Sequence, residues 1–375
     1  NTINGSLTSG SGAIDLSNST VSGSVTSNGT IALTAGLVQG NVSGRNGVTT
    51  SGAQIAGTVV SSNESVVLIG GSVQGDVSGK NGVTTSDVQI AGTMVSSNGS
   101  ITLTGGSVQG DVSGKNGVTT SGTQIAGSLS AASGAINLSG GSVGGLVTSG
   151  CCMVTSNGTD LLGGARSNSS GISISGGTIA GSFYANKNPA VFSAVTMTSG
   201  SVSGASSITF SDSTLGTAST PVSVTAVSDA VTLNNTIAYG DFVAPNYSTV
   251  QVNSPSVVYG TCRPGSTPPE ACGPLPSERL TLAWSMDESA WSGTVGEVLD
   301  SSGNGLHGRA YNGVTTGDAS PALPAVAGQG TCRYGSFSSI SRQYLQSADN
   351  SRLDLTGSFT IGVWVRTKSR ASQLM

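Results

Sequence analysis

Apolar residues recur along the first part of the chain at a step of 17 or 18 residues. Triplets of the form apolar-x-Gly-x-apolar are centred on Gly5, Gly23, Gly40, Gly57, Gly75, Gly92, Gly110, Gly127 and Gly145. A second apolar column keeps the same step at Ile14, Ile31, Val48, Val66, Val83, Ile101, Val118 and Ile136. Two columns in phase predict short strands with alternate side chains inward, joined by turns rich in Gly, Asn and Ser.

This repeat predicts a parallel β-helix with one coil every 17 to 18 residues. A strand of this kind cannot bury its apolar face alone, whereas stacked coils place Val on Val and Ile on Ile. The triplet glycines are expected at strand centres, where a side chain would crowd the next coil. Looser matches continue the pattern to about residue 260, at Ile179, Gly181, Phe183, Val202, Ile237 and Val257. About fourteen coils are expected, each about 4.8 Å high.

The composition changes after residue 260. Eighteen of the 32 charged side chains and all three Trp residues lie in the last 115 residues. We therefore predict an all-β chain of three parts: a parallel β-helix over 1–260, a Pro-rich, cysteine-bracketed linker over 261–279, and a different β domain over 280–375.

Five cysteines are candidates for disulfides. Cys262 and Cys272 bracket a short Pro-rich loop that a disulfide could close, and Cys272 with Cys332 is the competing pair. Cys151 and Cys152 are adjacent, and we expect them not to bond to each other. They would then be free thiols, intermolecular links or partners of the odd cysteine. One His and no CxxC spacing argue against zinc.

Net charge and hydropathy exclude some partners. The formal net charge is −4 and no Lys/Arg stripe is present, so nucleic acid is not an expected partner. No apolar run approaches 18 residues, so we expect no transmembrane segment in this sequence. No signal peptide is recognisable, so we interpret the sequence as a mature region or fragment whose targeting signal is missing.

Three ordered motifs in the last part resemble the LamG-like, concanavalin-type jelly-roll family. They are WSMDE from Trp284 to Glu288, DSSGNGLHG from Asp300 to Gly308 and GSFTIGVWV from Gly357 to Val365. The resemblance implies a lectin-like β-sandwich over 280–375. Such domains need well over a hundred residues to close both sheets, so we expect a truncated one.

Two further resemblances concern export and assembly. The segments WSMDESAWSG and GTCRYGSFSS follow a Gly/Ser-rich repetitive region. In this arrangement they resemble the MshQ-like family of mannose-sensitive haemagglutinin pilus biogenesis proteins. That resemblance implies an exported protein associated with a type IV pilus. The V-x-G-x-V step resembles bactofilins, which are cytosolic β-helix polymers. Cys262, Cys272 and the jelly-roll motifs argue against a cytosolic location for this chain.

Several residues could bind or react. Asp287, Asp300 and Asn304 offer hard oxygen ligands that suit calcium, which is the one cofactor that the sequence suggests. Trp291 is the best candidate for an exposed ring that stacks on a sugar. His307 is the only possible histidine base, and we interpret it as part of a structural turn. Asp287 and Glu288 are adjacent and would point to opposite strand faces, which argues against a glycosidase pair.

The repeats also carry polar columns. Asn41, Asp76 and Asp111 recur on alternate coils, four residues before Arg45, Lys80 and Lys115, and we interpret this as a solvated, salt-bridged face rather than a lyase site. Thr50, Thr85 and Thr120 invite an ice-binding interpretation. They alternate with Leu33, Leu68 and Leu103, however, and an ice-binding array must be flat and unbroken.

Together these observations predict a non-enzymatic, adhesin-like bacterial surface or pilus-associated protein. A solenoid stalk would present a lectin-like domain that binds a glycan or a surface protein, outside the cell or on its surface. The alternatives are a secreted carbohydrate-active enzyme, a lyase or a glycosidase, and a self-assembling β-helix filament.

Overall fold

A computed structural model describes residues 1–269, 271–273, 281–318, 333–354 and 362–363. These residues are almost entirely strand and turn, with one 3-10 helix at Ser351–Leu353. The chain divides into two compact units, Asn1–Leu275 and Pro276–Met375, which are described separately.

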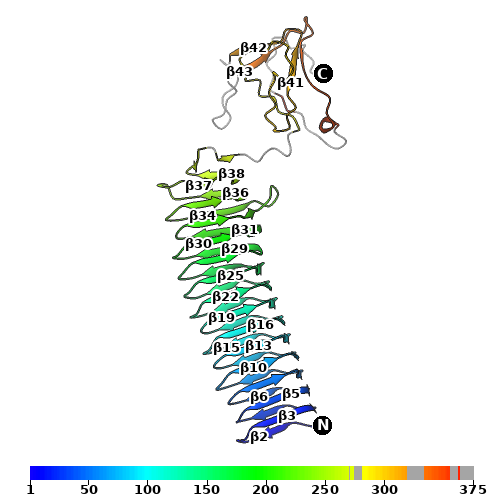
Figure 1. Ribbon diagram of the computed structural model, residues 1–375, viewed down its shortest axis with the longest axis vertical. Helices are drawn as coiled ribbons and strands as arrows, with labels where there is room; N and C mark the ends of the chain where they lie inside the picture. Colours follow the sequence, from blue (N-terminus) through cyan, green and yellow to red (C-terminus); the bar gives the residue numbers. More distant parts are fainter. Residues whose placement is uncertain (270, 274–280, 319–332, 355–361, 364–375) are drawn as a thin grey trace. The chain divides into compact units, whose positions relative to one another are not determined.

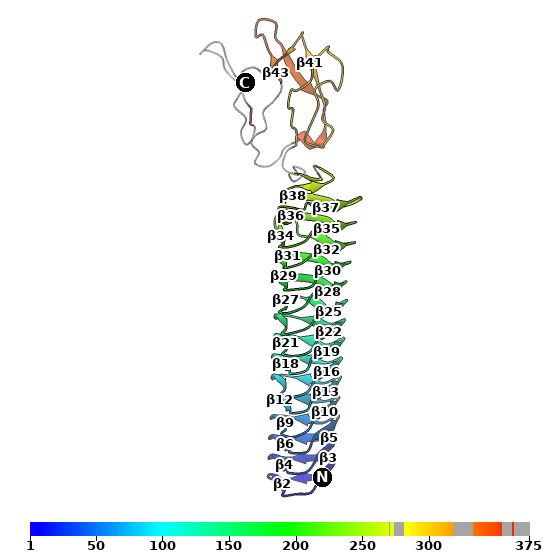
Figure 2. The same cartoon turned by 90° about the vertical axis from the view of Figure 1, so that its left-hand side faces the viewer.

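The first unit is a parallel β-solenoid of about 15 turns, which confirms the predicted fold (Figure 1). A regular coil contributes three strands, so the solenoid has three faces, which we call A, B and C. Figure 2 shows faces A and C as two columns of stacked strands. The strands of face A are β3 (Ile14–Val21), β5 (Ile31–Val38), β7 (Val48–Ser51), β10 (Val66–Ile69), β13 (Val83–Ser86), β16 (Ile101–Thr104), β19 (Val118–Ser121), β22 (Ile136–Ser139), β25 (Val154–Asn157), β28 (Ile172–Ser175), β30 (Ala190–Ser193), β32 (Ile208–Ser211), β35 (Val231–Asn234), β37 (Val250–Asn253) and β39 (Ser266–Thr267).

Faces B and C have shorter strands in the regular coils. Face B holds β1 (Thr2–Ile3), the ends of β3 and β5, β8 (Gln54–Ile55), β11 (Ser72–Val73), β14 (Gln89–Ile90), β17 (Ser107–Val108), β20 (Gln124–Ile125), β23 (Ser142–Val143), β26 (Asp160–Leu161) and β33 (Thr214–Leu215). Face C holds β2 (Leu7–Ser9), β4 (Val25–Ser27), β6 (Val42–Gly44), β9 (Val59–Ser61), β12 (Val77–Gly79), β15 (Met94–Ser96), β18 (Val112–Gly114), β21 (Leu129–Ala131), β24 (Val147–Ser149), β27 (Gly164–Ser167) and β34 (Val222–Ala226). Four longer strands run from face B into face C: β29 (Thr178–Ala185), β31 (Thr196–Gly204), β36 (Ile237–Val243) and β38 (Val257–Arg263). The short strand β40 (Cys272–Gly273) pairs with β38.

The register confirms the predicted apolar ladders. Ile55 pairs with both Val38 and Val73, and Val73 pairs with Ile90. The column that starts at Ile14 also stacks strand on strand to Ile136 and beyond, and all its members are buried. A one-residue slip would turn these side chains outward, so burial of the ladder holds every coil in phase.

The triplet glycines of the regular coils lie at the corner between faces B and C, so the prediction that they occupy strand centres is wrong for these coils. The crowding argument is confirmed there. A Cβ on Gly92 would lie 2.5 Å from the backbone of Gly75, and one on Gly110 would lie 2.7 Å from Gly92. In β29 and β31 the equivalent Gly181 and Gly200 do lie inside strands, with φ of 88° and 111°. The glycines allow the corners to approach closely.

The later coils of the solenoid bury larger side chains than the earlier ones. Ile179 and Phe183 pair with the preceding coil as predicted, and Val202 is buried. Phe192 stacks on Phe210, with ring centroids 4.8 Å apart. Ile237 and Val257 also pair on adjacent coils, but their side chains point outward and are 48% and 39% exposed.

Strand pairing continues beyond residue 260. β37 pairs with β39, and β38 pairs with β40, so residues predicted to form a linker belong to the last coil. Cys262 and Cys272 form a disulfide, one of the two pairings that the sequence left open. Proline did not end the solenoid, since the short strands between the prolines still find hydrogen-bond partners.

The second unit contains two antiparallel strand pairs. β41 (Gly308–Tyr311) pairs with β44 (Tyr344–Ser347), and β42 (Thr315–Asp318) pairs with β43 (Arg333–Ser336). A small core of Trp291, Val298, Ala310 and Val314 is packed against Trp284, Met286 and Leu345. The described residues form a compact β unit but not the two sheets of a concanavalin-like sandwich. The third predicted motif lies mostly outside the described residues.

Candidate functional site

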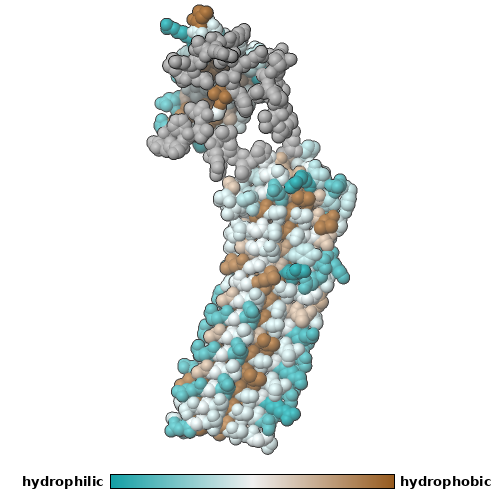
Figure 3. Space-filling model, turned by 180° about the vertical axis from the view of Figure 1, so that it is seen from behind, coloured by the Kyte–Doolittle hydropathy of each residue, from teal (hydrophilic) through white to brown (hydrophobic). Residues whose placement is uncertain are grey.

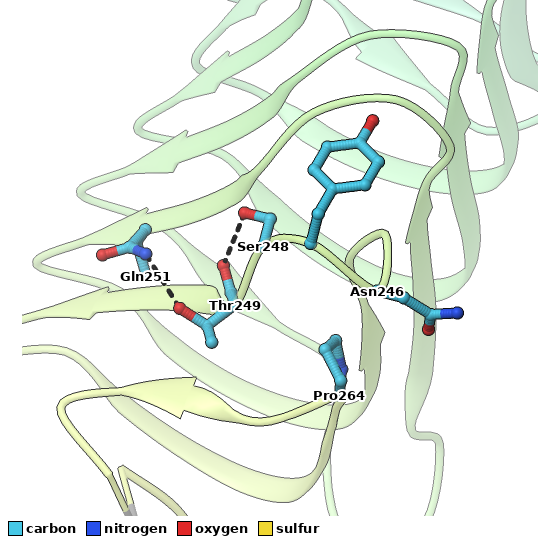
Figure 4. Close-up of a pocket in the computed structure, with 6 residues that line it drawn as sticks. Asn246, Ser248, Thr249, Gln251 and Pro264 are labelled. Carbon is cyan, nitrogen blue, oxygen red and sulfur yellow. Dashed lines mark hydrogen bonds between the residues drawn. The ribbon is translucent and has the colours of Figure 1, made fainter.

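An open hollow at the last coils of the solenoid is the candidate binding site of the first unit (Figure 4). It is lined by Asn246, Tyr247, Ser248, Thr249, Gln251 and Pro264. The first four come from the loop between β36 and β37, Gln251 from the outward side of β37, and Pro264 from the turn after β38. The loop extends a face that is otherwise flat, and so creates a concave surface.

The hollow joins one large ring to uncharged hydrogen-bonding groups. The Tyr247 side chain is 76% exposed, and its hydroxyl donates to the Ser228 carbonyl at 2.7 Å. Gln251 donates from Nε2 to Thr249 Oγ1 at 3.0 Å, which fixes the amide beside the hydroxyl. A ring face next to amide and hydroxyl groups suits a polyhydroxylated, uncharged ligand better than an ion.

The acidic column of the solenoid forms a structural ladder. Asp76 Oδ1 accepts from the backbone N–H of Thr93 at 2.7 Å and from its hydroxyl at 2.9 Å. These bonds, the backbone one foremost, lower the pKa of Asp76 against a small opposing effect of burial. Asp111 and Asn41 accept in the same way from Ser128 and Thr58. Each oxygen therefore binds a corner N–H of the following coil.

The basic residues of these repeats do not pair with the acids. Arg45, Lys80 and Lys115 are exposed, and among the residues that the structure describes no salt bridge joins them to the acidic column. The predicted salt bridges are therefore absent from this part of the chain, because the carboxylates turn toward the backbone of the next coil. Without a base beside a carboxylate, this corner has no pair suited to proton abstraction.

Asp300 organises the DSSGNGLHG turn of the second unit. Its carboxylate accepts from the backbone N–H groups of Ala283, Ser302 and Leu306 and from the Ser302 hydroxyl, at 2.8–3.0 Å. Partial burial raises the pKa of Asp300, but these four donors outweigh it and hold the pKa at about 2. The backbone of Asp300 also bridges to Trp284, so the first two motifs meet here.

Two glutamates hold the neighbouring loop. Glu288 accepts from Leu299 N–H at 2.7 Å and from Trp291 Nε1 at 3.2 Å. Glu297 accepts from Ser292, Gly293 and Ala310. Burial raises the pKa of Glu297, and these N–H donors lower it by more, so the net shift is downward. Both carboxylates therefore serve as structural acceptors.

The three proposed calcium ligands are already engaged. Asp287 accepts from the Arg333 N–H at 3.2 Å, Asn304 Oδ1 accepts from Arg352 Nη1 at 2.8 Å, and both Asp300 oxygens accept N–H or O–H donors. A calcium ion needs oxygen lone pairs directed at one point, so at least some of these hydrogen bonds would have to be given up for the three residues to bind it. Among the described residues, no group of three His, Cys, Asp or Glu could hold a metal ion. Calcium binding stays a prediction.

His307 and Trp291 have structural surroundings. His307 Nδ1 accepts from the Asp300 N–H at 3.0 Å, consistent with a role in the turn. The expectation that Trp291 is exposed is wrong, because its side chain is 8% exposed and is part of the second unit's core. Trp284 donates from Nε1 to the Leu306 carbonyl at 3.1 Å. Trp364 lies outside the described residues.

The remaining cysteine predictions have different outcomes. Cys151 and Cys152 form a disulfide with each other, so the expectation that they do not bond is wrong. They lie in a turn after β24, where the Cys152 N–H donates to Ser149 Oγ at 3.0 Å. Cys332, the competing partner of Cys272, lies outside the described residues.

Comparisons with protein-family models, with curated proteins and with solved structures find no match to this chain. Among the described residues, none belongs to a helix with the length and apolar character needed to cross a membrane.

The sequence pattern did not reveal the hollow. Four of its six residues come from the loop between β36 and β37, which interrupts the 17 to 18 step, so periodicity carries no information about them. The local signal was the cluster NYST at 246–249, in which one aromatic residue stands among amide and hydroxyl side chains.

Proposed function

We propose that this protein is an exported, adhesin-like bacterial surface protein that binds a glycan and does not transform it. The observation that carries the proposal is the continuous buried ladder of the first unit, which runs without a break from Ile14 to Val258. A core of this kind resists bending and suits a stalk or spacer. The resemblances to LamG-like and MshQ-like families support a lectin-like second unit and an association with pili.

The hollow at Tyr247 supports glycan binding by the solenoid itself. Its ring is exposed, its polar groups are uncharged, and Gln251 and Thr249 are positioned by their own hydrogen bond. Sugar rings stack on aromatic faces and satisfy amide and hydroxyl groups at the same time. A charged ligand would leave its charge without a partner among the lining residues.

A secreted carbohydrate-active enzyme is the alternative from another class. The acidic corner does not favour it, because Asp76 and Asp111 bind backbone N–H groups of the next coil. A self-assembling filament is the third possibility, and no observation on side chains favours it over a monomeric stalk.

A glycan array with the full chain tests the proposal, with and without calcium. We expect retention without product, loss of retention in Tyr247→Ala, and retention in Tyr247→Phe, which keeps the ring and removes only the bond to Ser228. Binding unaffected by Tyr247→Ala would place the glycan site elsewhere, with residues 280–375 the first alternative. Turnover that Asp76→Ala or Asp111→Ala abolishes would replace the adhesin with an enzyme.

A further inference from the structure

Face A carries a regular array of hydroxyl and amide groups on its outward side. From β13 to β32, two outward residues per strand face solvent, and all but Val191 are Thr, Ser or Asn. We call them the outward array: Thr84, Ser86, Thr102, Thr104, Thr119, Ser121, Asn137, Ser139, Thr155, Asn157, Ser173, Ser175, Val191, Ser193, Thr209 and Ser211.

The array differs from the threonine columns that the repeat first brings to notice. Thr50, Thr85 and Thr120 alternate with leucines because they belong to the inward column, and they are 2–5% exposed. The outward residues lie one position to either side of them. The objection that leucines break the rows therefore applies to the inside of the solenoid and not to its surface.

The geometry of the array is that of a lattice. Two rows of residues, Thr84–Thr102–Thr119 and Ser86–Thr104–Ser121, stay in unbroken parallel register over three coils. Neighbouring groups are about 4.8 Å apart between coils and about 6.6 Å apart along a strand. Figure 2 shows the strands of this face keeping nearly the same direction from coil to coil.

Four neighbouring hydroxyls of face A are free, whereas several hydroxyls of the other faces are used within the protein. Elsewhere in the array, the Ser86 hydroxyl donates to Asp87 at 3.3 Å and Ser211 Oγ accepts from Asn234 at 3.4 Å. On face B, Ser107 and Ser142 donate to Gln89 and Gln124 of the preceding coil. On face C, the Ser130 hydroxyl donates to Ser113. Within the described part of the chain, the hydroxyls of Thr102, Thr104, Thr119 and Ser121 have no side-chain or backbone hydrogen-bond partner.

The array is also uncharged and only weakly hydrophilic. No residue of the array is charged. Figure 3 shows the solenoid from the side opposite to Figure 1, where most of the visible surface also has near-neutral hydropathy, with polar and apolar residues gathered in narrow lines. A threonine offers a methyl group, which orders the water around it, beside a hydroxyl that donates and accepts. A charge adjacent to the array along the chain is the Asp87 carboxylate, which follows Ser86 at the end of β13 and accepts from its hydroxyl.

We propose that face A binds ordered water and, through it, the surface of an ice crystal. Rigid rows of hydroxyl and methyl groups with two fixed repeat distances hold water at positions set by the protein. The proposal requires that these two repeat distances, about 4.8 Å and about 6.6 Å, match oxygen spacings on a plane of hexagonal ice, so that this water can join the crystal. The inference is independent of glycan binding at the Tyr247 hollow, which lies outside the array.

Thermal hysteresis and inhibition of ice recrystallisation by the full chain test the proposal. We expect both activities in the unchanged protein. The double variant Thr102→Lys/Thr119→Lys places two hydrated charges on adjacent coils of face A and should lose most of both. The matched variant Ser113→Lys/Ser130→Lys places the same two charges on adjacent coils of face C and should keep them.

Three outcomes would overturn the proposal. Absence of both activities in the folded, unchanged protein would do so, as would equal loss in the two double variants at equal thermal stability. Sedimentation that shows pairing of chains through face A, disrupted only by the Thr102/Thr119 variant, would instead identify the array as a contact between copies.

Discussion

At the scale of single residues, carboxylates in both units act as caps for backbone N–H groups. Asp300 is the strongest case, with four donors and a pKa of about 2. Charge-assisted bonds of this kind are stronger than neutral ones, and leaving their donors unsatisfied is costly. The stability of the second unit should therefore depend on this one side chain.

Replacement of Asp300 by Asn should destabilise the second unit by on the order of 2 kcal/mol, because it removes the charge and gives the turn a donor where it needs an acceptor. Tryptophan fluorescence in urea measures this cleanly, since all three Trp residues follow residue 280. The exposed Asp349 changed to Asn is the control and should shift the transition little. Equal shifts would contradict the role given to Asp300.

The depressed pKa of Asp300 also predicts a pH dependence. Because the folded pKa is about 2 and the unfolded value is about 3.9, the stabilisation is fully present above about pH 5 and is lost as the pH falls through about 2. The fluorescence-detected free energy of unfolding should fall between pH 5 and pH 2. In Asp300→Asn the same decrease should be smaller, and an unchanged slope would exclude Asp300 as its source.

Corner glycines provide a second residue-scale test. A methyl group at Gly92 would lie 2.5 Å from the Gly75 backbone, so Gly92→Ala must displace one coil against another and should cost roughly 1–3 kcal/mol. Gly10→Ala is the control, since nothing lies within 4 Å of its Cβ position. Far-UV circular dichroism during heating reports the difference. A Gly92→Ala protein as stable as the control would mean that the corner has room.

At the scale of elements, each strand of the solenoid is stable only as part of a stack. Val77 is fully buried between Val59 and Met94, while Lys80 projects from the next turn into solvent. The two positions lie three residues apart and experience different environments. Substitutions at these two positions therefore distinguish the contribution of the buried ladder to stability from that of the surface.

We expect Val77→Asp to lower the thermal midpoint far more than Lys80→Ala, because an aspartate in a dry ladder has no partner. The solenoid transition, followed by circular dichroism, checks this. Ile90→Asp should behave like Val77→Asp, since Ile90 is buried between Val73 and Val108. Similar midpoints for Val77→Asp and Lys80→Ala would contradict an inward Val/Ile ladder.

At the scale of the whole molecule, the two units have separate hydrophobic cores of very different size. Among the described residues, the solenoid core contains dozens of buried residues in one continuous cluster, whereas the core cluster of the second unit contains four. Cores that share no residue have no common packing to unfold together.

We therefore expect two unfolding transitions in the full chain. Tryptophan fluorescence, which reports only the second unit, should change at a lower urea concentration than far-UV circular dichroism, which the solenoid dominates. A single transition at the same midpoint by both probes would show that the units unfold as one.

The sequence by itself determined the coil length, the apolar ladders and the crowded glycines, because stacking repeats the same local environment every 17 to 18 residues. It left Cys272 with two possible partners, Cys262 and Cys332, and the structure pairs it with Cys262. Only the tertiary structure decided what depends on contacts between coils or across loops. This includes the burial of Trp291, the bonding of Cys151 to Cys152, the use of Asp76 and Asp300 as N–H acceptors, and which hydroxyls of face A have no partner. Periodicity shows that alternate residues point inward, but a run such as VTTS at 118–121 leaves the exposed hydroxyls undecided until its register with Ile101 and Ile136 is known.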